Sequence, residues 1–327
     1  MSEVPFPFLC SICIPTFNRA EYLRETLSRI TAARSFQEKK IEIIISDNAS
    51  TDHTESVCRD FERNYPDRIR YFRLKDAIDP HFNFQNALNH GSGKFLKLNT
   101  DYIAFAKGQM DKFMELLERF QDEADLIMPA CCPKRKEEFV RIKTSDALLR
   151  HVSFRITSIN MFCIKSQTYR SLDNPFRAWK TFFPHVDIWF RLLDDGKNAV
   201  ILNHIGLLVQ RIVYRKERNQ AELFAHHYTA LLHTFVKRGK IQEKTFQQEK
   251  MLVLFQYIIP FHFDFFHQYN ESLKPLPFWK HTKYYRRDWF FYAALVWIAF
   301  YWFISNVIPI HQLLGKIKRH LRKPKPF

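Results

Sequence analysis

Two short apolar runs near the start of the chain constrain its fold more than any other feature of the sequence. Residues 9–14 lead into the polar segment 15–19, and residues 41–45 lead into the polar segment 46–52. Helical apolar periodicity follows the first polar segment over residues 20–33. A strand, a polar turn and a helix in succession are typical of α/β sheets, where ligands collect beyond the carboxyl ends of the strands. The two polar segments are therefore the first candidates for a binding site.

Apolar runs and helical patterns continue to alternate along the chain, which predicts a mainly parallel sheet with right-handed crossovers. We therefore expect an α/β fold with a Rossmann-like sheet flanked by helices and a helical C-terminal extension. The predicted domains are 1–215, 216–285 and 286–327. After the first two strands, we expect strands at 69–74, 94–98, 125–131, 160–165, 198–203 and 205–210, and helices at 52–65, 84–90, 110–120 and 184–195.

The composition narrows the kind of ligand and partner. Glycine is scarce, with 7 in 327 residues, and neither GxGxxG nor GxxxxGK occurs, so a glycine-rich phosphate loop is not the binding device. A net charge of +16 indicates a polyanionic neighbour, which can be nucleic acid, an anionic membrane or a phosphorylated substrate. The uncharged aromatic stretch 289–308 precedes a basic tail at 316–325. A membrane surface explains both features, whereas nucleic acid explains only the charge.

Two placements of the C-terminal segment 286–327 are open, a helix that spans the bilayer and a segment that lies in its surface. Positive residues flank the aromatic stretch on both sides, with Lys283, Arg286 and Arg287 before it and Lys316 after it. Because cytoplasmic flanks are the positive ones, this pattern favours an interfacial placement. No signal peptide precedes the cysteines, so we expect a peripheral or monotopic protein on the cytoplasmic face of the inner membrane.

Three motifs in the first hundred or so residues carry a resemblance to a known family. They are SICIPTFNR at 11–19, IISDNASTD at 44–52, and NFQN at 83–86 leading to GKFLKLNTD at 93–101. Together they resemble family 2 glycosyltransferases with the GT-A fold, within the branch of bacterial surface-polysaccharide enzymes that includes abequosyltransferase-like proteins. The resemblance covers roughly residues 8–210 and is strongest in the first half of that range.

The resemblance implies a pocket for a nucleotide sugar at the strand ends. It implies that Asp47 accepts a hydrogen bond from the base, a role that suits an ionised carboxylate because it is only an acceptor. The alternative is that Asp47 caps a turn together with Asn48 and Ser50. The other implied donor-binding residues are Pro15, Thr16, Asn18, Arg19, Asn48, Asn83, Asn99 and Thr100.

Asp101 stands where this family has an Asp-x-Asp element that holds a divalent cation, Mg²⁺ or Mn²⁺, against the sugar diphosphate. Such a cation neutralises the charge that develops on the leaving diphosphate. The sequence departs from the pattern because Asn99, Thr100 and Tyr102 surround a single acid. One carboxylate can still hold Mg²⁺ when phosphate oxygens and waters supply the other ligands. The alternative is that Asp101 is a turn residue.

Asp187 follows Phe182, Phe183 and His185 at the start of a predicted helix, similar to the place where the family has its catalytic acid. The resemblance implies that Asp187 is the general base that deprotonates the acceptor hydroxyl. The alternative is a negative charge that stabilises the helix N-terminus and has no chemical role.

These residues lead to two functional hypotheses. The first is an inverting glycosyltransferase that moves a sugar from a nucleotide-sugar donor to a hydroxyl of a saccharide acceptor. The acceptor would be an oligosaccharide or a lipid-linked saccharide, as in the synthesis of lipopolysaccharide O-antigen or capsule. The second is a catalytically inactive GT-A protein that binds nucleotide or acts as a scaffold at the membrane. Nucleic acid is not an expected partner, because no strand interleaves basic and aromatic residues.

Overall fold

The computed structural model describes residues 6–130, 132, 135–210, 222–259 and 282–307. Two compact units divide the chain: Met1–Arg218 with Ala230–Glu249, and Asn219–Thr229 with Lys250–Phe327. The predicted domain boundary at residue 215 and the basic tail 316–325 lie outside the described residues.

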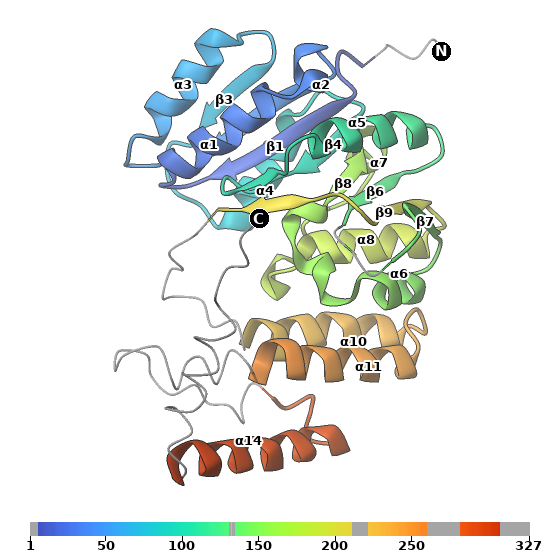
Figure 1. The fold of residues 1–327 in the computed structure, drawn as a ribbon. Helices are drawn as coiled ribbons and strands as arrows, with labels where there is room; N and C mark the ends of the chain where they lie inside the picture. The colour runs from blue at the N-terminus through green and yellow to red at the C-terminus, as the bar shows by residue number, and fades with distance from the viewer. Residues whose placement is uncertain (1–5, 131, 133–134, 211–221, 260–281, 308–327) are drawn as a thin grey trace, which may run out of the picture. The chain divides into compact units, whose positions relative to one another are not determined.

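The first unit is built on an eight-stranded, mainly parallel sheet, as predicted. Its strand order is β3-β2-β1-β4-β8-β6-β9-β7, which runs from left to right in Figure 1. Strand β1 pairs in parallel with β2 and β4, and β2 pairs in parallel with β3, while β8 and β7 run antiparallel to their neighbours. The strands are β1 (Cys10–Thr16), β2 (Ile41–Asp47), β3 (Ile69–Arg73), β4 (Phe95–Leu98), β6 (Leu126–Pro129), β7 (Phe139–Ile142), β8 (Cys163–Lys165) and β9 (Ala199–Leu202).

Helices cover both faces of this sheet because its central strands are apolar on both sides. Ile12 and Ile43 point into a core with Leu27 of α1 and Phe113 of α5, whereas Cys13 is buried on the other face. The helices of the unit include α1 (Ala20–Thr31), α2 (Arg34–Gln37), α3 (Thr54–Asn64), α4 (Pro80–His90), α5 (Gln109–Phe120), α6 (Ser145–Val152), α7 (Ser166–Arg170) and α8 (Pro184–Asp194), and the 3₁₀ turn η3 (Trp179–Thr181).

Two differences from the predicted elements concern the second half of the unit. The strand predicted at 205–210 is β10 (Leu207–Val209), which leaves the main sheet and pairs antiparallel with β5 (Ile103–Phe105). Strand β7 and helix α6 were not predicted at all. Both are short, so neither repeats the strand or helix period often enough to be read from sequence.

The helical run after residue 222 consists of η4 (Leu223–Tyr228), α10 (Thr229–Lys237), α11 (Glu243–Val253) and η5 (Leu254–Ile258). The second unit contains α14 (Trp289–Val307). Directly before this helix, Asp288 forms a buried ion pair with Lys250, in which Nζ and Oδ2 lie 2.5 Å apart. Within the described ranges, no helix has both the length and the apolar character needed to cross a membrane.

Candidate active site

The predicted donor-binding residues gather at the carboxyl ends of β1, β2 and β4. Thr16 and Asp47 are register partners at the ends of β1 and β2. The backbone N–H of Asn99 donates to the carbonyl of Cys13 at 2.9 Å, which holds the segment after β4 beside β1. The parallel sheet therefore brings together residues that lie far apart in sequence.

Asp101 is the centre of this group. The hydroxyl of Thr16 donates to its Oδ2 at 2.8 Å, and Nη1 of Arg19 donates to its Oδ1 at 3.3 Å. Burial raises the pKa of Asp101 to about 6, although Arg19 and Thr16 act in the opposite direction. The guanidinium of Arg19 also lies over the ring of Tyr102, 4.7 Å from its centroid. Asp101 is thus a buried acid paired with the guanidinium of Arg19.

The residues around Asp101 suit a cation only if the donor supplies most of the ligands. Asn99 donates its amide to the carbonyls of Thr100 and Ile103, and its Oδ1 lies 3.5 Å from Nζ of Lys97. Among the described residues, no group of three or more His, Cys, Asp or Glu side chains could hold a metal ion. A single carboxylate fits Mg²⁺ when phosphate oxygens and waters complete the shell. Asp101 would then be the protein ligand.

Asp47 is fully buried and already has three protein donors. Its Oδ1 accepts from the backbone N–H of Ser50 at 2.9 Å and from the Ser50 hydroxyl at 2.5 Å. Its Oδ2 accepts from the Tyr71 hydroxyl at 2.6 Å. Burial, and then this bond to the carboxylate, raises the pKa of Tyr71. These contacts match the turn-capping alternative, and the contact to a base stays a prediction.

The other predicted donor-binding residues fix the loops at the strand ends. The side-chain oxygen of Asn48 accepts from the backbone N–H of Ile78 at 2.9 Å, and its side-chain nitrogen donates to the carbonyl of Ile78 at 2.8 Å. Asn83 donates to the Ser46 carbonyl at 3.0 Å and accepts from the Ser46 hydroxyl at 2.6 Å, which ties α4 to the end of β2. Asn18 has a left-handed backbone with φ of 52° and accepts from the N–H of Thr51 at 2.7 Å. Pro15 is the penultimate, buried residue of β1.

Sequence reasoning missed two residues behind this group, Lys97 and Asn160. Nζ of the fully buried Lys97 donates to the carbonyls of Leu98 and Asn160, each at 2.9 Å. Burial lowers the pKa of Lys97 to about 8. The side-chain oxygen of Asn160 accepts from the N–H of Thr100 at 2.8 Å. A lysine inside an apolar strand was the signal that the sequence offered.

Asp187 lies in the first turn of α8 and is buried. Nε of Arg177 donates to Oδ2 at 3.1 Å, and Nη2 of Arg177 donates to Oδ1 at 3.3 Å. Nε of Arg191, one helical turn further on, lies 3.0 Å from Oδ2. Sequence reasoning missed both arginines, although the spacing of Asp187 and Arg191 by four residues indicated one of them.

His185 next to Asp187 faces the interior. Its Nε2 lies 3.0 Å from the carbonyl oxygen of Thr157, and burial lowers its pKa to about 4. The imidazole is therefore neutral near pH 7, and its contacts are structural.

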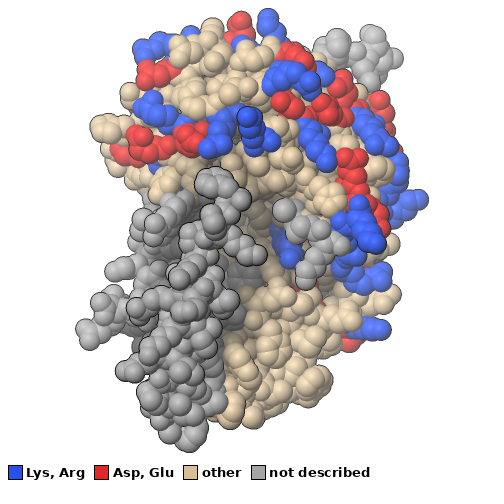
Figure 2. Space-filling view, viewed as in Figure 1, with Lys and Arg blue, Asp and Glu red and all other residues tan. Residues whose placement is uncertain are grey.

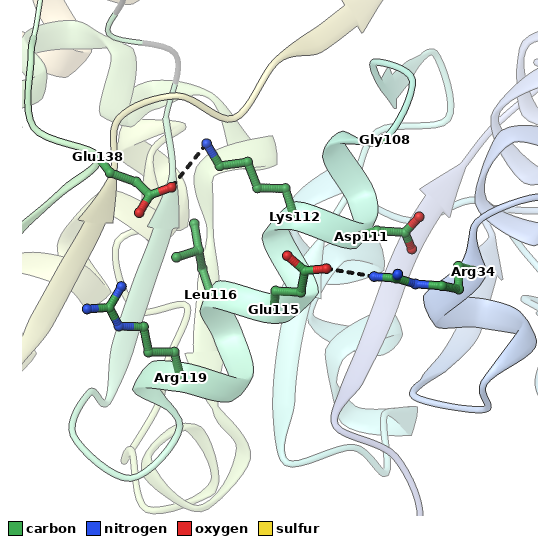
Figure 3. Close-up of a pocket in the computed structure, with 8 residues that line it drawn as sticks. All are labelled: Arg34, Gly108, Asp111, Lys112, Glu115, Leu116, Arg119 and Glu138. Atoms are coloured by element: carbon green, nitrogen blue, oxygen red, sulfur yellow. Dashed lines mark hydrogen bonds and ion pairs between the residues drawn. The ribbon is translucent and has the colours of Figure 1, made fainter.

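A separate surface depression of about 600 Å³ lies along α5 (Figure 3). Arg34 pairs with Glu115 at 2.6 Å, and Lys112 pairs with Glu138 at 3.1 Å. With Asp111 and Arg119, its lining holds equal numbers of positive and negative side chains. The depression therefore offers no excess positive charge to a diphosphate. Blue and red side chains are also interspersed over the upper part of the face shown in Figure 2.

A mainly parallel sheet with one acid at the end of β2 and another after β4 defines this chain as a protein of the GT-A class. The chain belongs to the family Glycosyl transferase family 2, which matches residues 11–192. Both statements confirm what the three sequence motifs predicted. The match covers the strand ends and the first turns of α8.

Curated relatives match shorter stretches. Abequosyltransferase RfbV of Salmonella typhimurium is 36% identical over 121 residues, which are 37% of this chain and 35% of the relative. GalNAc(5)-diNAcBac-PP-undecaprenol beta-1,3-glucosyltransferase of Campylobacter jejuni is 32% identical over 106 residues, 32% of this chain and 33% of the relative. The chain thus spans about a third of the length of these relatives.

Solved structures share the fold at low identity. Mannosyltransferase PcManGT from Pyrobaculum calidifontis, in complex with GDP-Man and Mn²⁺, has a TM-score of 0.54 at 14% identity and covers 80% of this chain and 76% of its own. TarS 1-349 of S. aureus, in complex with UDP-GlcNAc, has a TM-score of 0.54 at 13% identity and covers 79% and 76%. At these identities the likeness concerns the fold alone.

Proposed function

We propose that this chain is an inverting glycosyltransferase that moves a sugar from a nucleotide-sugar donor to a hydroxyl of a saccharide acceptor in bacterial surface-polysaccharide biosynthesis. The grouping of Thr16, Arg19 and Asp101 beside Asp47 carries the proposal. It places one cation and two acids at the strand ends, where α/β sheets bind nucleotides. Family membership and the two curated relatives support sugar transfer.

In this proposal, different strand-end residues contact different parts of the nucleotide-sugar donor. Asp47 accepts a hydrogen bond from the base, and the loops fixed by Asn48 and Asn83 shape its surroundings. Arg19 contacts the diphosphate, because its guanidinium is partly exposed beside Asp101. A bound Mg²⁺ or Mn²⁺, held by Asp101, would neutralise charge on the departing nucleoside diphosphate. The Mn²⁺ in the mannosyltransferase structure supports this cofactor.

Asp187 acts as the general base. The acceptor oxygen attacks the anomeric carbon from the face opposite the diphosphate, the bond from that carbon to the diphosphate oxygen breaks, and the acceptor proton moves to a carboxylate oxygen of Asp187. Arg177 and Arg191 hold the carboxylate in one orientation. Because the Arg177 side chain is partly exposed, the acceptor can approach the carboxylate from this side of the ion pair.

The acceptor is a lipid-linked saccharide, and residues 286–327 place the enzyme on the cytoplasmic face of the inner membrane. The undecaprenol-linked substrate in the name of the Campylobacter relative supports this acceptor. The large exposed apolar residues of α14 support the membrane surface, because four of them lie three, seven, eight and eleven residues after the first, which places all five on one side of the helix. They are Trp289, Tyr292, Val296, Trp297 and Phe300. Residues 1–215 would then be the catalytic domain.

Thermal unfolding with a panel of nucleotide sugars, each with and without Mg²⁺ or Mn²⁺, tests the donor site. A donor present at about 100 times its Kd stabilises the folded protein by about 3 kcal/mol. We expect stabilisation by at least one donor, and its loss in Asp47→Asn. Binding without turnover would favour the inactive scaffold, for which the ion-paired state of Asp101 and Asp187 is the supporting observation. Stabilisation by no donor would contradict the proposed glycosyltransferase and the nucleotide-binding form of the alternative.

A further inference from the structure

Three aromatic side chains form a cluster on the surface of the first unit, and we name it the aromatic platform. Phe82 of α4 and Phe182 are 38% and 41% exposed, and Trp179 of η3 is half-buried. The ring centroids of Phe82 and Trp179 lie 5.5 Å apart. The ring centroid of Phe182 lies 5.7 Å from that of His81, the residue before Phe82. Two segments separated by about a hundred residues thus bring these rings to the same part of the surface.

The backbone of Phe182 is held in a conformation that phenylalanine rarely adopts. Its φ is 65°, in the left-handed region. Two contacts hold it there: its N–H donates to the carbonyl of Trp179 at 2.9 Å, and its own carbonyl oxygen lies 3.2 Å from Nε2 of His81. Such outliers persist only when surrounding contacts fix them, and they concentrate at binding and catalytic sites. Here the conformation keeps a large ring exposed to solvent.

The platform borders both halves of the proposed active site. Phe82 precedes Asn83, whose side chain bonds to Ser46 at the end of β2. Phe182 precedes Phe183, whose carbonyl accepts the backbone N–H of Asp187 at 3.2 Å. The segment that carries Phe82 is thus tied to the end of β2, and the segment that carries Trp179 and Phe182 is tied to the helix turn of Asp187. In the proposed mechanism, an acceptor that presents its hydroxyl to Asp187 lies beside the second segment.

We propose that the aromatic platform binds a sugar ring of the acceptor saccharide, an inference that rests on the proposed glycosyl transfer. A pyranose has a face of C–H bonds that stacks on the negative face of an aromatic ring and buries apolar area there. Its hydroxyls then point to the rim, where Lys180 is exposed and Arg177 is partly exposed. Nζ of Lys180 lies 5.6 Å from the centroid of Trp179, close enough to reach a bound ring.

The size of the platform argues against a protein partner. A stable protein interface buries about 800 Å² on each side, which three partly exposed rings do not supply. A saccharide needs only one or two rings for each sugar. A lipid chain is the remaining apolar ligand, and the experiment distinguishes it from a sugar.

Phe182→Gly is the informative variant, because glycine adopts a positive φ without steric cost. The substitution removes the ring and leaves the backbone of the loop unstrained. Lys39→Gly is the matched control, since Lys39 is also exposed, has a φ of 58°, and precedes β2 at the end opposite Asp47. Any effect of glycine at a left-handed position alone would show in both variants.

The probe is octyl β-glucoside below its micelle-forming concentration. Saturation-transfer NMR on the full-length protein measures which protons of the probe contact the protein. We expect transfer to the C–H protons of the sugar ring in the wild-type protein and in Lys39→Gly, and a drop of about tenfold in Phe182→Gly. No transfer to the sugar ring, an undiminished sugar signal in Phe182→Gly, or a loss in Phe182→Gly of transfer to the octyl chain alone would each overturn the proposal.

Thermal stabilisation by UDP-GlcNAc and GDP-mannose, measured on the same three proteins, separates this inference from the proposed function. The platform predicts equal donor stabilisation in all three. Sugar contact at the platform without stabilisation by any donor would support the platform as a sugar site and contradict the proposed glycosyl transfer. A loss of donor stabilisation in Phe182→Gly alone would assign the ring to the donor site and overturn the inference.

Discussion

Arg177 donates to both carboxylate oxygens of Asp187, at 3.1 and 3.3 Å, and so fixes the plane of a buried carboxylate. A general base needs a defined direction toward the hydroxyl that it deprotonates. In the proposed mechanism, the guanidinium of Arg177 supplies this direction from the partly exposed side of the ion pair.

Arg177→Gln should therefore slow transfer without weakening donor binding. A misdirected base costs between about 10- and 100-fold in kcat. Steady-state kinetics with a saturating donor measures kcat, and thermal stabilisation by the donor gives the binding control. Unchanged kcat would show that Arg191 alone orients Asp187.

Asp101→Asn should change the pH dependence of stability. Burial raises the pKa of Asp101 from 3.8 to about 6, so the folded protein holds this proton more tightly than the unfolded chain does. Its contribution to stability is present below pH 4 and is lost as pH rises through 6. Asparagine does not titrate, so the variant does not lose stability from this group as pH rises. Its free energy of unfolding relative to wild type should therefore rise by about 3 kcal/mol between pH 4 and pH 7. Urea titrations at these pH values measure the difference, and a flat difference would contradict the buried, paired state of Asp101.

Lys97→Met should change the pH dependence of stability in the opposite direction and at higher pH. Burial lowers the pKa of Lys97 from 10.5 to about 8, so the unfolded chain binds the proton more tightly. The charged lysine costs stability below pH 8, and this cost disappears as pH rises toward 10.5. The stability of the variant relative to wild type should therefore fall by about 3 kcal/mol between pH 8 and pH 10.5. A pH-independent difference measured by urea unfolding would show that Lys97 titrates normally.

Gly93→Ala should destabilise the junction between β1 and β4. A Cβ at this position would lie 2.7 Å from the backbone nitrogen of Ser11 and 2.8 Å from the carbonyl carbon of Cys10. Overpacking against backbone costs about 1 to 3 kcal/mol. Gly206→Ala is the control, because the nearest atom to its Cβ would be 3.5 Å away. Equal melting temperatures for the two variants would contradict the close approach.

Much of the fold could be predicted from the sequence, and the parts that could not be predicted have physical reasons in common. Apolar strands such as β1, β2 and β4, each leading into a polar segment, can be read from the sequence. Their carboxyl ends lie together as predicted, since Thr16 is the register partner of Asp47 and donates to Asp101. The short β7 carries no such signal. The contacts of Asp187 with Arg177 were also invisible, since they depend on how the irregular segment before α8 folds back on the helix.

The most direct test of the central proposal measures sugar transfer by wild type and Asp187→Asn. Radiolabelled UDP-GlcNAc, GDP-mannose and other nucleotide sugars are incubated with undecaprenyl-diphosphate-linked saccharides and Mg²⁺ or Mn²⁺, and label in the lipid fraction is counted. We predict transfer from at least one donor, and a fall in kcat of about 100-fold or more in Asp187→Asn with donor binding retained. Transfer by Asp187→Asn at the wild-type rate would contradict the assignment of the base, and the absence of transfer from every donor tested would contradict the proposed function.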